Sequence, residues 1–280
     1  MIIIAESGST KTDWRILHRD GKQLTIVTEG FNPNYHQGSA LSAMMEDVSR
    51  QAEILRAESL FFYGSGCSSP AAVHKVATAV NHILPNVKVE VQHDLFGAAR
   101  ALFGSGTGFA SILGTGSSSC FFRNGEIVSA VPSLGFLLGD EGSGMQLGSL
   151  LLNAWFKKDL PEHLAEAFEK RYSLKIGEFI NQLYSHPKPN SLIASYVPFL
   201  VEYKNETVVK QLVATAFEDF ITKIILKYPN CRKHELGFVG SVAFLFQNIL
   251  SETILKHQLK PGRIIQNPME ELVKYHLEKL

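Results

Sequence analysis

The order of predicted strands and turns repeats along this chain. Alternating apolar positions predict strands at 2–5, 14–18 and 24–28, and again at 109–113, around 120–122 and at 126–131. In both sets a glycine- and hydroxyl-rich turn follows the first strand, and an Asx-Gly pair, Asp20-Gly21 or Asn124-Gly125, joins the other two. Asx-Gly pairs favour hairpins because both turn positions need positive φ. We interpret the chain as two copies of one fold unit; the alternative is a coincidence between two ordinary hairpins.

Helical spacing of apolar residues predicts most of the remaining elements. Helices are predicted at 41–55, 70–84, after 94, at 145–157, several times over 160–228, at 242–256 and at 267–280; further strands are predicted at 60–63, 87–91, 236–239 and 263–266. The stretch 134–144 is too glycine-rich for a helix, and 160–228 carries no chemical motif. The best domain boundary is Gly104–Gly108.

Composition bounds the class of protein. With 280 residues and 45% hydrophobic content, the chain can bury a large core in one or two domains. Its 27 basic and 27 acidic residues balance, which indicates neither a nucleic-acid surface nor a membrane surface. No apolar run approaches the roughly 20 residues of a membrane-spanning helix, and Met1–Ala5 is too short for a signal peptide. Three cysteines without a CxxC pair favour a cytoplasmic location.

Two turns carry the chemistry of a phosphate site. Glycines let a backbone approach a ligand closely, successive N–H groups bind anions, and hydroxyls add donors. Gly8-Ser-Thr-Lys11 and Gly114-Thr-Gly-Ser117 both fit this description, and Lys11 could reach a phosphate. The first turn lacks a glycine directly before the lysine, so it is not a Walker loop. Taken singly, each turn could be a plain hairpin; paired at matching positions they favour nucleotide binding.

Asp94 follows a predicted strand and precedes a helix, where open α/β sheets place ligands. From local sequence alone, such an Asp is most simply a helix N-cap. The functional alternative is a carboxylate that accepts a hydroxyl proton during phosphoryl transfer. We expect His93 to pack or orient rather than act as a base. Gly64-Ser-Gly66 is a near miss for a dinucleotide fingerprint, but it follows the fourth strand of its unit rather than the first.

Other polar residues lie in glycine-rich or proline-flanked turns. Asp140 and Glu141 could bind sugar hydroxyls or stabilise their turn. Asn32 could likewise be a turn residue or a residue that hydrogen-bonds a ligand. Glu6 and Asp13 are candidate Mg²⁺ contacts, direct or through water. There is no Gly-x-Ser-x-Gly elbow and no HExxH, which excludes the common hydrolase and zinc-protease motifs.

With these motifs in order, the chain resembles the N-acetylglucosamine kinase and BadF/BadG ATPase family of the actin/hexokinase/Hsp70 superfamily. The resemblance spans the whole chain. It is carried by seven segments: 6–12, Gly30-Phe-Asn32, Gly64-Ser-Gly66, Asp94, Gly114-Thr-Gly-Ser117, Gly139-Asp-Glu-Gly-Ser143 and Gly237-Phe-Val-Gly-Ser241. One departure stands out: the first loop begins Glu6-Ser7-Gly8 where the family usually has Asp-Gly-Gly.

The resemblance implies an α/β fold of two ribonuclease-H-like (actin-like ATPase) domains with an interdomain nucleotide cleft that holds ATP and Mg²⁺. Residues 1–108 would form the first domain; residues 109–280 would form the second, with a helical insert and a last helix that packs back on the first. Asp94 falls on the catalytic base. Sugar-binding positions fall on or near Asn32, Ser65, Gly66, Thr115, Gly116 and Asp140; nucleotide-binding positions fall on Ser9, Thr10, Lys11, Thr12, Gly114, Gly116, Ser117, Gly240 and Ser241; Glu6 and Asp13 would face the metal.

The sequence therefore predicts ATP-dependent phosphorylation of an amino-sugar hydroxyl, with the 6-position of N-acetylglucosamine as the first choice. The alternatives are an ATPase activator of an iron–sulfur dehydratase, which would need cysteines to ligate a cluster, and a non-catalytic sugar or nucleotide sensor. The helical segment 160–228 is a candidate contact surface for a homodimer.

Overall fold

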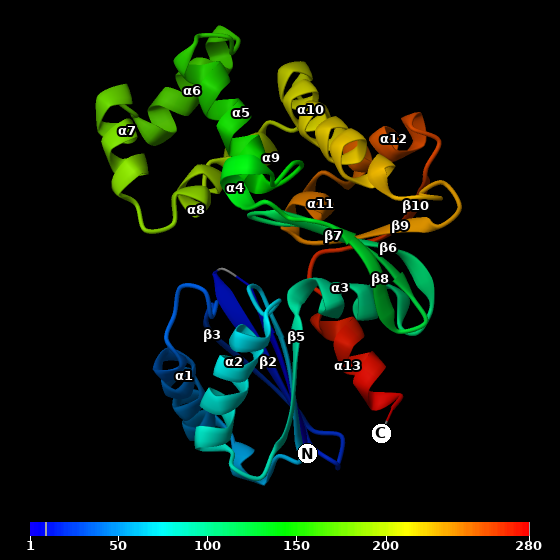
Figure 1. Cartoon of the computed structure of the whole chain (residues 1–280). Coiled ribbons are helices and arrows are strands. Elements are labelled where there is room, and N and C mark those ends of the chain that lie inside the picture. Colours follow the sequence, from blue (N-terminus) through cyan, green and yellow to red (C-terminus); the bar gives the residue numbers. More distant parts are fainter. Residues whose placement is uncertain (9, 280) are drawn as a thin grey trace. The chain divides into compact units, whose positions relative to one another are not determined.

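The computed structural model describes residues 1–8 and 10–279. The chain divides into two compact units, each described by itself below (Figure 1). The first unit contains Met1–Gly106, Arg123–Ile127 and Asn267–Leu280, and the second contains Thr107–Phe122 and Val128–Gln266. Among the described residues, no helix has both the length and the hydrophobicity needed to cross a membrane.

The first unit is built on a five-stranded sheet in the order β3-β2-β1-β4-β5. Its strands are β1 (Ile2–Ser7), β2 (Lys11–Leu17), β3 (Gln23–Glu29), β4 (Ser59–Gly64) and β5 (Lys88–His93). The first three strands pair antiparallel, whereas β1, β4 and β5 are parallel. Residues Ile3, Ala5, Trp14 and Ile16 join a buried core with apolar residues of α1 (Gly38–Gln51) and α2 (Pro70–Ile83). Helices α3 (Asp94–Phe103) and α13 (Met269–Leu277) contact β1 as well, and α13 also contacts β2.

The second unit repeats this topology. Its sheet has the order β10-β9-β6-β7-β8. Read in reverse, this is the order of the first sheet, with β6 to β10 in the places of β1 to β5. The strands are β6 (Thr107–Leu113), β7 (Ser117–Arg123), β8 (Glu126–Val131), β9 (Glu235–Val239) and β10 (Lys260–Ile265). As β1 does with β4, β6 pairs parallel with β9, and β9 pairs parallel with β10. The repeated fold unit predicted from the sequence is therefore confirmed.

The two Asx-Gly hairpins differ in detail. Asn124 and Gly125 have φ of 55° and 86°, as the two-residue turn between β7 and β8 requires. Between β2 and β3 only Gly21 has positive φ (85°), and five residues, 18–22, separate the paired ends Leu17 and Gln23. The prediction that both Asx-Gly positions have positive φ is thus right for the second hairpin and wrong for the first.

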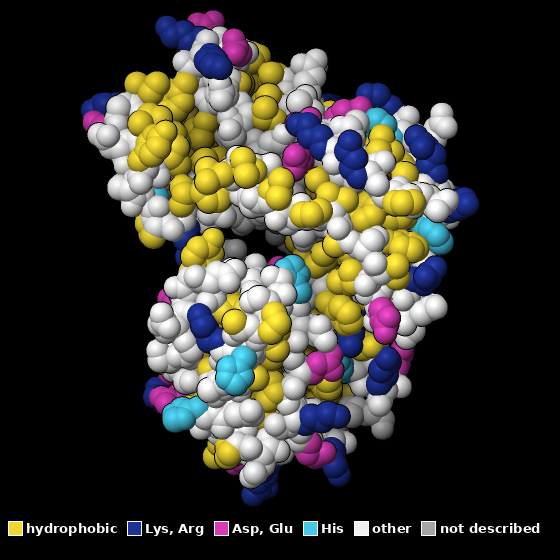
Figure 2. Space-filling model, in the orientation of Figure 1, with side chains coloured by type: hydrophobic (Ala, Val, Ile, Leu, Met, Phe, Trp, Pro, Cys, Tyr) yellow, Lys and Arg dark blue, Asp and Glu magenta, His cyan; other side chains and the backbone are white. Residues whose placement is uncertain are grey.

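Helices fill the rest of the second unit around a large apolar core. They are α4 (Gly135–Leu138), α5 (Gly144–Phe156), α6 (Glu162–Tyr172), α7 (Ile176–Ser185), α8 (Pro189–Ala194), α9 (Val197–Glu202), α10 (Thr207–Lys223), α11 (Ser241–Leu245) and α12 (Gln247–Lys256), with a short 3₁₀ turn at Ile225–Lys227. The first unit has a 3₁₀ turn of its own at Ile54–Arg56. Hydrophobic side chains gather on the surface of the helical region (Figure 2), where α7 exposes Ile176, Ile180 and Tyr184.

Two sequence predictions about helices need correction. The stretch 134–144 holds one helical turn, α4, because Gly135 and Gly139 flank the good helix formers Phe136–Leu138 rather than interrupt them. The helix predicted over 242–256 is two helices, because the buried Phe246 leaves the helical conformation (φ −112°, ψ 26°) between α11 and α12. By contrast, the Ser69 cap is confirmed: its hydroxyl accepts a hydrogen bond from the Ala72 N–H.

Candidate active site

Three carboxylates form an acidic cluster in the first unit: Glu6, Asp13 and Asp94. Glu6 and Asp13 are direct partners across β1 and β2, so their side chains share one face of the sheet. Burial, together with the negative charges of Asp94 and Asp13, raises the pKa of Glu6 to about 7, although Lys11 opposes the shift. Like charges held this close repel one another, and a bound cation would relieve the repulsion.

Asp13 is not free of other contacts. It is buried and forms an ion pair with Arg15, which also pairs with Glu270 of α13 at 3.0 Å. Among the described residues, no group of three or more His, Cys, Asp or Glu side chains is arranged to hold a metal ion by itself. One or two carboxylates completed by water and phosphate oxygens are, however, the usual environment of Mg²⁺ in phosphoryl transfer, and Glu6 with Asp13 fits that donor set.

Asp94 is the first residue of α3 rather than its N-cap. The cap is His93, whose Nδ1 accepts a hydrogen bond from the Leu95 N–H at 3.1 Å. The Asp94 Oδ1 accepts from the same N–H at 2.8 Å and lies 2.8 Å from His93 Nδ1, which in the protonated ring donates to that carboxylate instead of accepting from Leu95. Burial lowers the pKa of His93, but the hydrogen bond and charge of Asp94 outweigh it and leave that pKa above its usual value. The Asp94 side chain stays 18% exposed, so a substrate hydroxyl could reach it.

Asn32, Ser65 and Gly66 lie together at the carboxyl ends of β1 and β4. Gly66 has φ of 81°, and a Cβ added there would lie 2.3 Å from the Asn32 Oδ1. The Ser65 N–H donates to the Ser7 carbonyl at 2.9 Å. The nearly buried Asn32 uses its Oδ1 to accept from the Asn34 N–H. Three sequence-predicted sugar contacts therefore meet in one loop region, although part of the Asn32 amide already stabilises its own turn.

The first glycine turn spans residues 8–11, and Ser9 lies outside the described residues. Gly8 N–H donates to the Lys11 carbonyl at 3.0 Å and closes the turn, with Thr10 and Lys11 exposed. Thr12 behaves differently: its hydroxyl is fully buried, donates to the Glu29 carbonyl and lies 2.7 Å from the Ser7 hydroxyl. The Thr12 side chain thus fixes β2 to β3 and β1, which leaves Thr10 and Lys11 as the accessible phosphate donors of this turn.

In the second unit, glycines bring three chain segments into contact around the second turn. A Cβ at Gly240, whose φ is 124°, would lie 2.3 Å from the Leu113 carbonyl oxygen. The Gly144 N–H donates to the Gly114 carbonyl at 2.7 Å, and the Met145 N–H donates to the Thr115 carbonyl at 3.1 Å. The loop after β6, the start of α5 and the loop after β9 therefore form one backbone-lined site.

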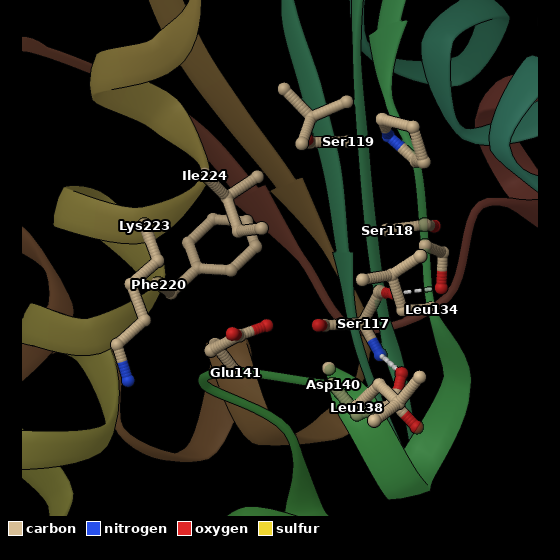
Figure 3. Close-up of a pocket in the computed structure, with 14 residues that line it drawn as sticks. Ser117, Ser118, Ser119, Leu134, Leu138, Asp140, Glu141, Phe220, Lys223 and Ile224 are labelled. Atoms are coloured by element: carbon tan, nitrogen blue, oxygen red, sulfur yellow. Dashed lines mark hydrogen bonds between the residues drawn. The ribbon is translucent and has the colours of Figure 1, made fainter.

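Asp140 closes one side of this site. It is buried, has φ of 62°, and its Oδ1 accepts from the Ser117 N–H at 3.0 Å (Figure 3). A Cβ at Gly116 would lie 2.9 Å from that oxygen, so any larger residue there would displace the Asp140 carboxylate. Burial raises the pKa of Asp140, and the Ser117 N–H opposes the shift. Beside Asp140 is a cavity of about 240 Å³ whose walls include Leu134, Leu138 and Phe220 and into which the Glu141 carboxylate points (Figure 3).

A second cavity, of about 360 Å³, opens beside the glycine turn. It combines Gly114, Thr115, Gly144 and Ser241 with an apolar wall made of Ala194, Val197, Pro198, Val201, Val242 and Leu245. An apolar slot next to backbone N–H groups and a hydroxyl suits a flat base attached to phosphates.

The apolar wall was missed from the sequence, where 160–228 carries no recognisable motif. Its α8–α9 residues nevertheless recur at helical spacing: Ala194, Val197, Pro198 and Val201 follow an i, i+3, i+4, i+7 pattern. That pattern predicts a buried helix face as readily as a ligand wall, so it could not identify a site by itself.

Comparison with known proteins gives the family. Neither a scan of protein-family models nor a search of curated proteins gives a match. Among solved structures, a proposed N-acetylglucosamine kinase from Porphyromonas gingivalis is 40% identical over 99% of both chains, with a TM-score of 0.94. The chain belongs to the N-acetylglucosamine kinase family. The resemblance inferred from the seven motifs is confirmed.

More distant structures share the fold of this kinase family. A proposed N-acetylglucosamine kinase from Chromobacterium violaceum is 16% identical over 98% of both chains, with a TM-score of 0.73. A ROK-family glucokinase from Streptomyces griseus, in complex with glucose and AMPPNP, is 13% identical over 98% of this chain and 97% of its own, with a TM-score of 0.56. The predicted α/β fold of two actin-like ATPase domains is likewise confirmed.

Proposed function

We propose that this protein transfers the γ-phosphoryl group of ATP to a hydroxyl of N-acetylglucosamine, most simply the 6-hydroxyl. The observation that carries the proposal is the 40% identity over 99% of both chains with the proposed N-acetylglucosamine kinase of P. gingivalis. The residues of both units are compatible with it, since one unit gathers carboxylates and the other brings glycine-rich backbone segments together beside an apolar cavity.

In this proposal Asp94 is the catalytic base. Its carboxylate is held at the start of α3 by the Leu95 N–H, stays partly exposed, and would take the proton of the attacking hydroxyl. Asn32, Ser65, Gly66, Thr115, Gly116 and Asp140 would bind the sugar. Phosphoryl transfer needs little covalent help from the protein, so positioning of the hydroxyl against the phosphorus would supply most of the rate enhancement.

The phosphates would lie on the two turns, held by Thr10 and Lys11 of one and Gly114, Gly116 and Ser117 of the other, with Gly240 and Ser241 toward the nucleoside. The Thr12 hydroxyl, also predicted as a contact, donates to the Glu29 carbonyl and would hold the turn in place instead. Ser9, also predicted from the sequence, would belong to the first turn. Glu6 and Asp13 would hold the hydrated Mg²⁺, which when bound neutralises charge on the phosphates. The leucines beside Asp140 favour a sugar with an N-acyl group over an unsubstituted hexose.

A coupled assay of ADP release tests the proposal. We expect release with N-acetylglucosamine and ATP-Mg²⁺, and much slower release with glucose, glucosamine or no sugar. Release without any sugar would instead indicate an ATPase activator. All three cysteines, Cys67, Cys120 and Cys231, are buried, which gives such an activator no exposed thiolate for a shared cluster. No release with any sugar, but tight sugar binding by calorimetry, would indicate a sensor.

A further inference from the structure

Helix α13 packs on the sheet face of the first unit that carries the acidic cluster. It contacts α3, β1 and β2. Glu6 of β1 is paired in parallel register with Tyr63 of β4, so both side chains point to this face. Tyr63 is 1% exposed and lies at the centre of the contacts between α13 and α3.

The Tyr63 hydroxyl joins two helices through a chain of hydrogen bonds. Arg100 Nη1 of α3 donates to it at 2.7 Å, and it lies 2.8 Å from Nε2 of His276 in α13. Because a guanidinium can only donate, the tyrosine proton is directed to His276. Burial and the positive charge of Arg100 lower the pKa of His276 to about 4, so its ring is neutral and can accept that proton. The order of donation is therefore Arg100 to Tyr63 to His276.

Further contacts fix the rotation of α3. The Arg100 guanidinium lies over the rings of Phe96, at 4.4 Å, and Tyr275 of α13, at 5.2 Å, and it donates to Glu90 Oε1 at 2.6 Å. On the same helix, a Cβ at Gly97 would lie 2.8 Å from Tyr63 Cδ1, so the α3 backbone rests directly on the tyrosine ring.

The first residue of this helix is Asp94. Arg100 lies six positions further along α3, about 9 Å along the helix axis. A rotation or slide of α3 therefore moves the Asp94 carboxylate together with Arg100. The other end of α13 reaches the acidic cluster independently, since Glu270 pairs with Arg15 and Arg15 pairs with Asp13.

We propose that Tyr63 and Arg100 are positioning residues for Asp94, and that α13 holds them in place through His276. None of these three side chains is among the proposed substrate contacts. The inference rests on the proposed function, because it assigns their task by reference to the base of that reaction. A displacement of about 1 Å at a reacting group can cost a hundredfold in rate, so a small shift of α3 is enough to matter.

The test is Tyr63→Phe, which removes the shared hydroxyl and keeps the ring under Gly97. We expect kcat to fall about tenfold while KM for ATP stays at the wild-type value. Hydrogen exchange of the peptide covering residues 93–97 should accelerate. Arg100→Ala should lower kcat as well, and Arg100→Lys, which keeps a donor for Tyr63, should restore part of it.

Tyr228→Phe is the matched control. Tyr228 is also buried, and its hydroxyl bonds the Ser119 hydroxyl, the Ser119 carbonyl and the Val131 N–H in the second unit, each at 2.8 Å. Tyr228→Phe should lose as much thermal stability as Tyr63→Phe. It should keep the wild-type kcat and the wild-type rate of hydrogen exchange in the peptide covering residues 93–97. A folded Tyr63→Phe with wild-type kcat and exchange, or equal kcat losses in both variants, would overturn the inference. If the wild-type protein transfers no phosphate, the proposed function fails and the exchange comparison alone decides the positioning role.

Discussion

The two units share one sheet topology and differ in what they place at the ends of their strands. The first unit places Glu6, Asp13 and Asp94 there, and burial, followed by the negative charges of Asp94 and Asp13, raises the pKa of Glu6 to about 7. The second unit places glycine-rich backbone and an apolar cavity of about 360 Å³ there, with Asp140 held by the Ser117 N–H. One scaffold thus gathers carboxylates in one copy and glycine-rich backbone beside an apolar cavity in the other, which is the division of labour that the proposed function uses.

The first glycine turn and the second one show the same contrast. In the first, the flanking hydroxyls of Ser7 and Thr12 point into the unit and bind backbone carbonyls. In the second turn, other segments bind the backbone. The N–H groups of Gly144 and Met145 donate to carbonyls of the turn, and Gly240 packs against the end of the preceding strand. A hydroxyl in a glycine-rich turn is therefore not by itself a ligand contact.

The largest effect should come from removing the proposed base. Asp94→Asn keeps the shape of the side chain and an oxygen that accepts from the Leu95 N–H, but the amide cannot take the proton of the sugar hydroxyl at neutral pH. We expect kcat to fall about 100- to 10,000-fold, the usual contribution of a general base, with the ATP dissociation constant unchanged. Asp140→Asn, in the other unit, should raise the sugar KM far more than it lowers kcat. Steady-state kinetics measure both, and wild-type kcat in Asp94→Asn would contradict the base assignment.

Gly240→Ala should have the next largest effect. Its Cβ would lie 2.3 Å from the Leu113 carbonyl oxygen at a φ of 124°, so the loop after β9 must move away from the second turn. We expect at least a tenfold loss of ATP affinity by calorimetry and a loss of about 2 kcal/mol in stability. Gly177→Ala is the control, because nothing lies within 4 Å of its added Cβ. Equal ATP affinity in both variants would argue against a nucleotide at this turn.

A smaller effect follows from the raised pKa of Glu6. Unfolded Glu6 ionises near pH 4.5 and folded Glu6 near pH 7, so the folded state binds more protons between those values and loses stability as pH rises through them. Glu6→Gln should therefore be more stable than wild type at pH 8, by about 3 kcal/mol, and similar to it near pH 4.5. Denaturant titrations at both pH values measure the difference, and a pH-independent difference would contradict the shift.

The smallest effect concerns the hairpins. Asn124→Ala should cost about 1 kcal/mol, because Asn124 holds a φ of 55° that alanine adopts poorly. Asp20→Ala should cost less than about 0.5 kcal/mol, since Asp20 has no positive φ and loses only an exposed hydrogen bond to the Lys22 N–H. Equal losses in thermal unfolding would mean that the two turns are energetically alike.

The repeated topology was predictable from the sequence because strand alternation and Asx-Gly pairs are local signals. Family membership was predictable because seven motifs kept their order. What could not be predicted depends on contacts distant in sequence. The Asp13–Arg15–Glu270 pairing joins β2 to a helix about 250 residues later, and the apolar wall at Val197 and Val201 looks like any buried helix face. The role of His93 as cap in place of Asp94 depends on where β5 ends, and helix boundaries are weakly encoded.

The place of α13 in the chain has a consequence for synthesis. Residues 1–106 leave the ribosome first, but Tyr275 and His276, which cover Arg100 and Phe61, are made more than 150 residues later. Until then the Phe61 ring and the Tyr63 hydroxyl on this face of the nascent sheet lack their partners from α13. The sheet of the first unit therefore completes its packing only after α13 has been made, and until then its exposed aromatic face is a site at which a chaperone could act.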